Sequence, residues 1–128
     1  MGERSLARVT NATRGAVLAA RAELAEDVWT RLVGLLGRAG LASDGGMVLE
    51  PCDSVHTAFM RFPIDVVVLS REGEVLFAQG DVRPWRLVWP VRGGRAVVEL
   101  PAGTIARTGT ARGDRVVREG LEDTCAST

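Results

Sequence analysis

The chain contains no lysine and no tyrosine, and histidine, asparagine and glutamine each occur once. All sixteen of its basic residues are therefore arginine, so an arginine-rich stretch is weak evidence for a phosphate site. Sixteen acidic residues balance them, and the formal net charge is zero. Because proteins that bind nucleic acid rely on a basic surplus that releases counterions, the composition predicts no nucleic-acid partner.

Long apolar runs are also missing. No segment approaches the roughly 20 apolar residues that a membrane helix needs, and residues 1–6 lack the apolar stretch of a signal peptide. The two cysteines, Cys52 and Cys125, are far apart in the sequence, and disulfides are rare in the cytosol. We therefore expect two free thiols in a cytoplasmic protein that has no membrane partner.

Aromatic residues are few, with three tryptophans and three phenylalanines. A core must therefore rest on valine, leucine and alanine. Of the 128 residues, 46% are hydrophobic and 25% are charged, a balance that is ordinary for a globular protein. The length fits a single domain over residues 1–128, and we expect the polar tail at 121–128 to be frayed.

Short apolar runs bounded by turn residues predict that most of the chain is β-strand. The expected strands are residues 6–9, 16–20, 47–49, 55–60, 65–70, 74–79, 96–100 and 115–118. The run that Asp65 opens is apolar without alternation, which indicates a strand covered on both faces. Arg71-Glu72-Gly73 predicts a hairpin turn whose glycine adopts the left-handed conformation.

Two segments have helical character. Residues 26–37 predict the main helix, because their apolar side chains recur at helical spacing. A second, short helix is expected over 101–107, with Pro101 in its first turn. The sequence therefore predicts a mainly β (α+β) fold, either a compact β sandwich or a partly open barrel, with these two helices.

His56 is the obvious proton carrier, because it is the chain's sole histidine. A catalytic histidine needs an orienting acceptor and a neighbouring nucleophile. Candidate acceptors are Asp53, Asp65 and Asp114, and candidate nucleophiles are Cys52, Ser54 and Thr57. A small hydrolase that uses His56 with Asp65 is one hypothesis. The alternative is a structural histidine that bonds a backbone carbonyl at a strand edge.

The second notable feature is Arg83-Pro84-Trp85-Arg86, with Trp89-Pro90 close behind. Tryptophan and arginine are enriched at binding hot spots, although a proline-rich loop pinned by a buried tryptophan is the alternative. We expect a groove between residues 56–65 and residues 85–89. The candidate ligand-binding residues are Arg31, His56, Met60, Arg61, Arg83, Trp85 and Arg86.

Neither a metal nor a cofactor is expected. The Cys52-x-x-x-His56 spacing is not a zinc pattern, and no second pair of ligands accompanies it. The glycine pairs at 45–46 and 93–94 lack both the glycine spacing and the lysine of a phosphate-binding loop.

Five stretches of the chain occur in the order of the motifs of a known family. They are residues 30–38, 46–49, 56–60 together with 63–65, 98–103 and 113–116. Together they resemble the domain of unknown function 192 family of bacteria and archaea over about residues 20–118. The resemblance implies a compact, mostly β domain of sandwich type and implies no activity. Ala58 stands where the family often has a larger residue, and Arg61-Phe62 replaces a more polar linker.

The sequence thus predicts an uncharacterised bacterial single-domain protein of the cytoplasm. Its predicted role is that of a non-catalytic accessory module that binds a small molecule or a protein partner. The small hydrolase and a purely structural domain are the alternatives.

Overall fold

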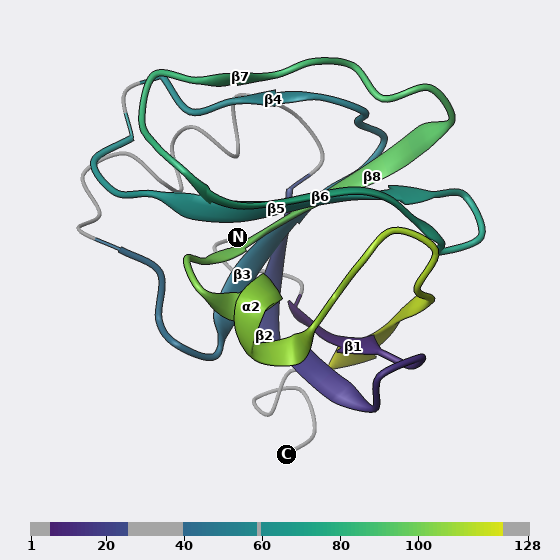
Figure 1. The fold of residues 1–128 in the computed structure, drawn as a ribbon. Helices are drawn as coiled ribbons and strands as arrows, with labels where there is room; N and C mark the ends of the chain where they lie inside the picture. The colour runs from purple at the N-terminus through teal and green to yellow at the C-terminus, as the bar shows by residue number, and fades with distance from the viewer. Residues whose placement is uncertain (1–5, 26–39, 59, 122–128) are drawn as a thin grey trace, which may run out of the picture.

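The computed structural model describes residues 6–25, 40–58 and 60–121 (Figure 1). The elements within them are β1 (Leu6–Asn11), β2 (Ala16–Ala25), β3 (Gly45–Leu49), β4 (Val55–His56), β5 (Ile64–Ser70), β6 (Val75–Val82), β7 (Leu87–Val88), β8 (Gly94–Pro101), α2 (Thr104–Thr108) and β9 (Val116–Leu121). The mainly β fold is confirmed. The helix predicted at 26–37 and nearly all of the polar tail lie outside the described residues.

Seven strands form one mixed sheet in the order β6-β5-β8-β3-β2-β1-β9, while β4 and β7 form a separate two-stranded ribbon. β6 and β9 are the two edges of the sheet, yet their first residues meet. The Val116 N–H donates to the Gly73 carbonyl oxygen, and the Val75 N–H donates to that of Asp114, both at 2.8 Å. The sheet therefore closes at one end only, which confirms the predicted partly open barrel.

β5 lies between β6 and β8 in the sheet and is buried on both faces, as its unbroken apolar run predicted. Val67 and Leu69 pack into a core on the inner face of the half-barrel. Val66 and Val68 pack into a second core on the opposite face, which we call the ribbon core because β4 and β7 cover it. Figure 1 shows these two strands as a layer on the side of β5 and β6 away from α2.

The hairpin between β5 and β6 also follows the prediction. Gly73 has a φ of +91°, the left-handed region that glycine enters without steric cost. The Gly73 N–H donates to the Ser70 carbonyl oxygen at 3.0 Å, which closes the turn. A Cβ atom at this position would lie 2.5 Å from the Val116 carbonyl oxygen, so glycine is also needed where β9 approaches.

The carboxylate of Asp65 is fully buried and joins three elements. Its Oδ1 atom accepts hydrogen bonds from the backbone N–H groups of Asp81, at 2.8 Å, and Gly103, at 3.2 Å. Its Oδ2 atom accepts from the Ile105 N–H at 2.7 Å. The first turn of α2 has no cap from its own N-cap residue, Gly103, so Asp65 satisfies these otherwise unpaired donors.

Several predicted element boundaries are wrong. The short helix begins after Gly103 rather than at Pro101, because β8 stays paired with β5 through Pro101. The strand predicted over 55–60 ends at His56, because the Thr57 carbonyl oxygen accepts from the Met60 N–H in a turn. β7 was not predicted, and β2 continues beyond its predicted end.

A buried polar network joins the β1–β2 turn to the start of β9. The Asn11 side-chain amide donates to the Thr110 hydroxyl and to the Asp114 carboxylate, both at 3.0 Å. The Arg14 Nε atom donates to the same carboxylate at 2.9 Å. The hydrogen bond from Arg14, and then that from Asn11, lower the pKa of Asp114 from its ordinary 3.8 to about 2.

Replacing Asp65 with asparagine is expected to lower the free energy of unfolding by about 1.5–3 kcal/mol, the usual worth of hydrogen bonds to a charged group. The asparagine keeps the size of the side chain but removes the charge and turns one acceptor into a donor that faces backbone N–H groups. Urea denaturation at neutral pH measures the loss. The exposed Asp81→Asn variant is the control, and equal stability of the two variants would contradict the structural role.

The Asp114 carboxyl makes folding sensitive to acid. Because its pKa is lower in the folded chain, its stabilisation is complete above the ordinary value of 3.8 and is lost as the pH falls toward about 2. Asp114→Asn should therefore flatten the dependence of unfolding free energy on pH in this window. Exposed Asp44→Asn is the control and should leave the wild-type slope unchanged. An unaltered slope in Asp114→Asn would refute the prediction.

Candidate functional site

His56 lies in the ribbon, directly opposite Leu87 of β7. The neighbouring pair, Val55 and Val88, is buried in the ribbon core. Because side chains alternate between the two faces of a strand pair, His56 and Leu87 share the outer face. His56 is half-buried, and its Nδ1 atom is buried without a hydrogen-bond partner among the described residues.

Thr57, the next residue, fastens the loop between β6 and β7. Its hydroxyl donates to the Arg83 carbonyl oxygen at 2.7 Å and accepts from the Arg86 backbone N–H at 2.8 Å. The Thr57 N–H donates to the Arg86 carbonyl oxygen at 2.9 Å, and the Thr57 carbonyl oxygen accepts from the Trp85 N–H at 3.0 Å. One fully buried threonine thus fixes three residues of a loop that is remote from it in sequence.

Three large apolar side chains are exposed in the five-residue stretch 85–89, which runs from this loop through β7 to the residue after it. They are Trp85, 62% exposed, Leu87, 52% exposed, and Trp89, 74% exposed; we call them the ribbon surface. Trp85 has a φ of +64°, a left-handed conformation that is costly for a residue other than glycine. The bonds to Thr57 hold it there. The alternative in which Trp85 fills the core is therefore wrong.

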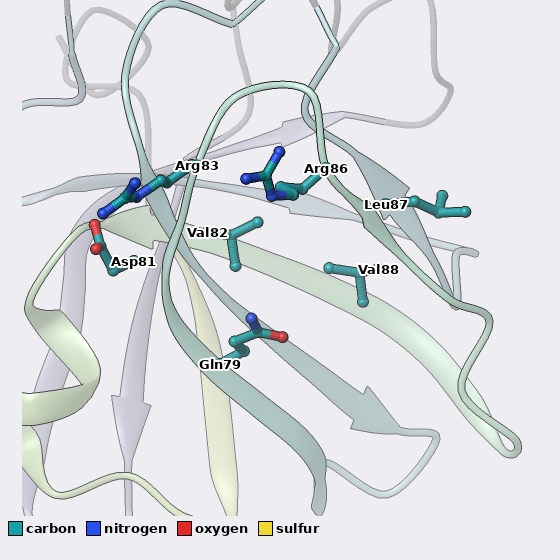
Figure 2. Close-up of a pocket in the computed structure, with 7 residues that line it drawn as sticks. All are labelled: Gln79, Asp81, Val82, Arg83, Arg86, Leu87 and Val88. Atoms are coloured by element: carbon teal, nitrogen blue, oxygen red, sulfur yellow. The ribbon is translucent and has the colours of Figure 1, made fainter.

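A cleft of about 310 Å³ lies between the end of β6 and β7. Seven residues line it, and Figure 2 labels each of them. They include Arg83 and Arg86, as well as Leu87, which also belongs to the ribbon surface. Trp85 is not part of the lining. Asp81 lines the cleft on the side of Arg83, and Arg86 lies between Arg83 and Leu87 in Figure 2.

The cleft itself is lined by two positively charged residues, Arg83 and Arg86, and one negatively charged residue, Asp81. Residues 82–98 include four arginines and no acidic residue. Arg95 pairs with Glu50, where Nε and Oε2 are 3.3 Å apart. Within residues 6–25, 40–58 and 60–121, neither Arg83 nor Arg86 forms an ion pair through its guanidinium group.

The structure places the predicted site residues in different surroundings. Thr57 and the pairing of β4 with β7 bring the His56 segment and the arginines of the loop together. Asp65 is placed differently, because its two oxygens already accept three backbone N–H groups. Met60 is buried in the ribbon core, and Arg61 is exposed. Arg31 lies outside the described residues.

Two other candidates for catalysis, Cys52 and Asp114, have hydrogen-bond partners outside any catalytic arrangement with His56. The Cys52 thiol donates to the Ser54 carbonyl oxygen at 2.9 Å. Asp114 lies in the network with Asn11 and Arg14. Among the described residues, no group of three or more histidine, cysteine or acidic side chains could hold a metal ion. No described helix has the length and apolar character to cross a membrane.

Sequence reasoning missed three features of this region. Gln79 and Asp81 line the cleft, and no local pattern marked them. Glu99 is a fully buried carboxylate. It lies opposite Met47 and Val66, and so faces the ribbon core. An acidic residue within the apolar run of residues 96–100 was a signal that could have identified it.

Comparison with known proteins extends the resemblance seen in the motifs. The profile of the family described as "Uncharacterized ACR, COG1430" (DUF192) matches residues 9–118. A UPF0127 protein of Thermococcus sibiricus is 30% identical over 121 residues, which cover 91% of this chain and 77% of the relative. A UPF0127 protein of Pyrococcus furiosus is 40% identical over 63 residues, 49% of this chain and 53% of the relative.

Two crystal structures share the fold. A proposed transcription regulator from Sinorhizobium meliloti 1021 matches with a TM-score of 0.74 and 26% identity over 91% of this chain and 94% of that one. A protein of unknown function from Novosphingobium aromaticivorans matches with a TM-score of 0.70 and 23% identity over 88% and 83% of the two chains. Because the family profile spans most of the sequence, this chain belongs to the uncharacterised DUF192 family, whose members are also named UPF0127 proteins.

Proposed function

We propose that this protein is a non-catalytic module that docks an extended segment of a partner protein on the ribbon surface. The observation that carries the proposal is the exposure of Trp85, Leu87 and Trp89 within five residues. Exposed large apolar side chains that cluster are unusual on a monomeric surface and mark interaction sites. Tryptophan is also the residue type most enriched at binding hot spots.

The loop between β6 and β7 is ordered before a partner binds. Binding costs less when a loop is already fixed in its bound conformation, because less conformational entropy is lost. Thr57 supplies this order, since its hydroxyl and its backbone bond Arg83, Trp85 and Arg86. The ribbon surface therefore offers its side chains in a defined arrangement rather than on a loose loop.

Charge complementarity indicates the chemistry of the partner. Arg83, Arg86 and Arg92 flank the ribbon surface in a stretch that has no acidic residue. A partner segment with apolar residues at its centre and acidic residues on either side matches this arrangement. An acidic protein supplies such a segment. A nucleic acid matches less well, because the formal net charge of the chain is zero. A regulatory role, such as the name of the Sinorhizobium meliloti protein proposes, would then act through protein contacts.

The hydrolase hypothesis has weaker support. A catalytic histidine needs a carboxylate or another acceptor to orient it. Asp65 gives its two oxygens to three backbone N–H groups, which favours a structural role for this carboxylate. His56 instead shares the outer face of the ribbon with Leu87, where it would contact a docked segment.

Selection of a random dodecapeptide display library against the immobilised full chain tests the proposal. Trp89→Ala and Leu87→Asp are each expected to weaken binding of selected peptides about tenfold or more, because they remove exposed hot-spot contacts. Fluorescence polarisation of labelled peptides measures the affinity. Both variants should keep wild-type stability, since exposed substitutions usually change it little.

Val17→Asp provides the matched control for this experiment. Val17 is also an exposed apolar residue, 43% exposed, but lies in β2 rather than in the ribbon. It should leave peptide affinity unchanged. Failure to select any peptide, or equal losses in Val17→Asp and Leu87→Asp, would refute docking on the ribbon surface.

Thr57→Val should weaken both the fold and peptide binding. The valine keeps the shape but leaves the Arg86 N–H and the Arg83 carbonyl oxygen without the hydroxyl, which should cost about 1–3 kcal/mol of unfolding free energy. Thr57→Ser keeps the hydroxyl and should restore peptide affinity. Amide NMR shifts of Arg83, Trp85 and Arg86 report the position of the loop, and unchanged shifts in Thr57→Val would contradict the assigned role.

A further inference from the structure

We propose that the cleft between β6 and β7 is a carboxylate subsite that takes a glutamate or aspartate side chain of the segment docked on the ribbon surface. This inference rests on the proposed function and adds the feature of the partner that the cleft selects. The observation behind it is that Arg83 and Arg86 both line the cleft and that neither has an ion-pair partner in the described part of the chain.

The cleft and the ribbon surface are continuous. Leu87 is 52% exposed on the outer face of the ribbon and also lines the cleft. A segment that packs on Leu87 therefore passes the mouth of the cleft. A single side chain can reach inward from it, while the segment itself stays on the ribbon surface.

The two guanidinium groups start from fixed backbone positions. Thr57 bonds the Arg83 carbonyl oxygen at 2.7 Å, the Arg86 N–H at 2.8 Å and the Arg86 carbonyl oxygen at 2.9 Å. A guanidinium group presents its donors in a planar fork, which matches the two oxygens of a carboxylate. Because the backbone is already ordered, an incoming carboxylate needs to order only the two side chains.

The lining of the cleft favours a carboxylate over a phosphate. Asp81 also lines the cleft, and its negative charge reduces the positive potential that Arg83 and Arg86 create for any anion. Val82 and Val88 add apolar surface to the lining. The methylene groups of a glutamate side chain can pack against these valines, whereas a phosphate group has nothing to place there.

The test of this subsite uses two kinds of probe on the full chain. First, N-acetylglutamate N-methylamide, its glutamine analogue and inorganic phosphate are titrated separately at low ionic strength. The Nε–H NMR signals of Arg83 and Arg86 should shift with the glutamate compound. They should shift much less with phosphate and not at all with the glutamine analogue. Equal or larger shifts with phosphate would overturn the preference for a carboxylate.

Second, the selected peptides are compared with copies in which each acidic residue in turn is replaced by its amide. One replacement should weaken binding to the wild-type chain about tenfold, in line with a charge-assisted contact at an interface. The same replacement should have little effect on Arg86→Gln, because the subsite is already lost there. Arg92→Gln is the matched control, since Arg92 is exposed in the same stretch but does not line the cleft.

The outcomes separate the two proposals. If Arg86→Gln and Arg92→Gln lose affinity equally, the arginines act only through their overall charge and the subsite is refuted. If peptides require Trp89 but no acidic residue, docking on the ribbon surface stands and the subsite falls. If no peptide is selected, docking fails by itself, and the titration with the glutamate compound still decides whether the cleft binds a carboxylate.

Discussion

The buried carboxylate of Asp65 is the constraint on which the arrangement of the fold depends. It stands in strand β5, between β6 and β8, and accepts hydrogen bonds from three backbone N–H groups, those of Asp81 at the end of β6 and of Gly103 and Ile105 at the start of α2. Asp81 has a φ of +55°, so the chain leaves β6 in a conformation that needs such support. The direction in which the chain enters the 83–86 loop therefore depends on a residue that never reaches the surface.

Thr57 fixes the next part of the chain, the loop that leads from β6 into the ribbon. One face of the sheet is buried in the inner core, and the other face is covered by the ribbon. The ribbon core therefore depends on the position of β4 and β7. Val55 and Val88 point inward and supply that contact, which leaves Leu87 and His56 on the outside. The burial of Val55 and Val88 and the exposure of Leu87 thus have the same origin, namely the alternation of side chains across one short strand pair.

Local patterns in the sequence were sufficient to predict structure where one physical effect dominates. The apolar run of β5 predicted burial on both faces, because a strand that never alternates has no polar face to expose. Gly73 predicted its turn, because few other residues adopt its φ of +91°. The motifs that resembled the family were also sufficient, and the profile match over residues 9–118 confirmed them. The boundary errors arose where distant partners decide: β8 stays a strand through Pro101 because β5 pairs with it.

The sequence by itself determined a mainly β domain of this family, and it singled out His56, Arg83, Trp85 and Arg86 as candidates. Only the tertiary structure decided how they combine. The contacts of Thr57 with Arg83 and Arg86 span 26 and 29 residues, and no local periodicity encodes a contact over such a separation. Likewise, Asp65 and Asp81 are both aspartates with apolar neighbours in the sequence. Asp65 has a structural role because it is buried and accepts hydrogen bonds from three backbone N–H groups. Asp81 is exposed, and its side chain lines the cleft.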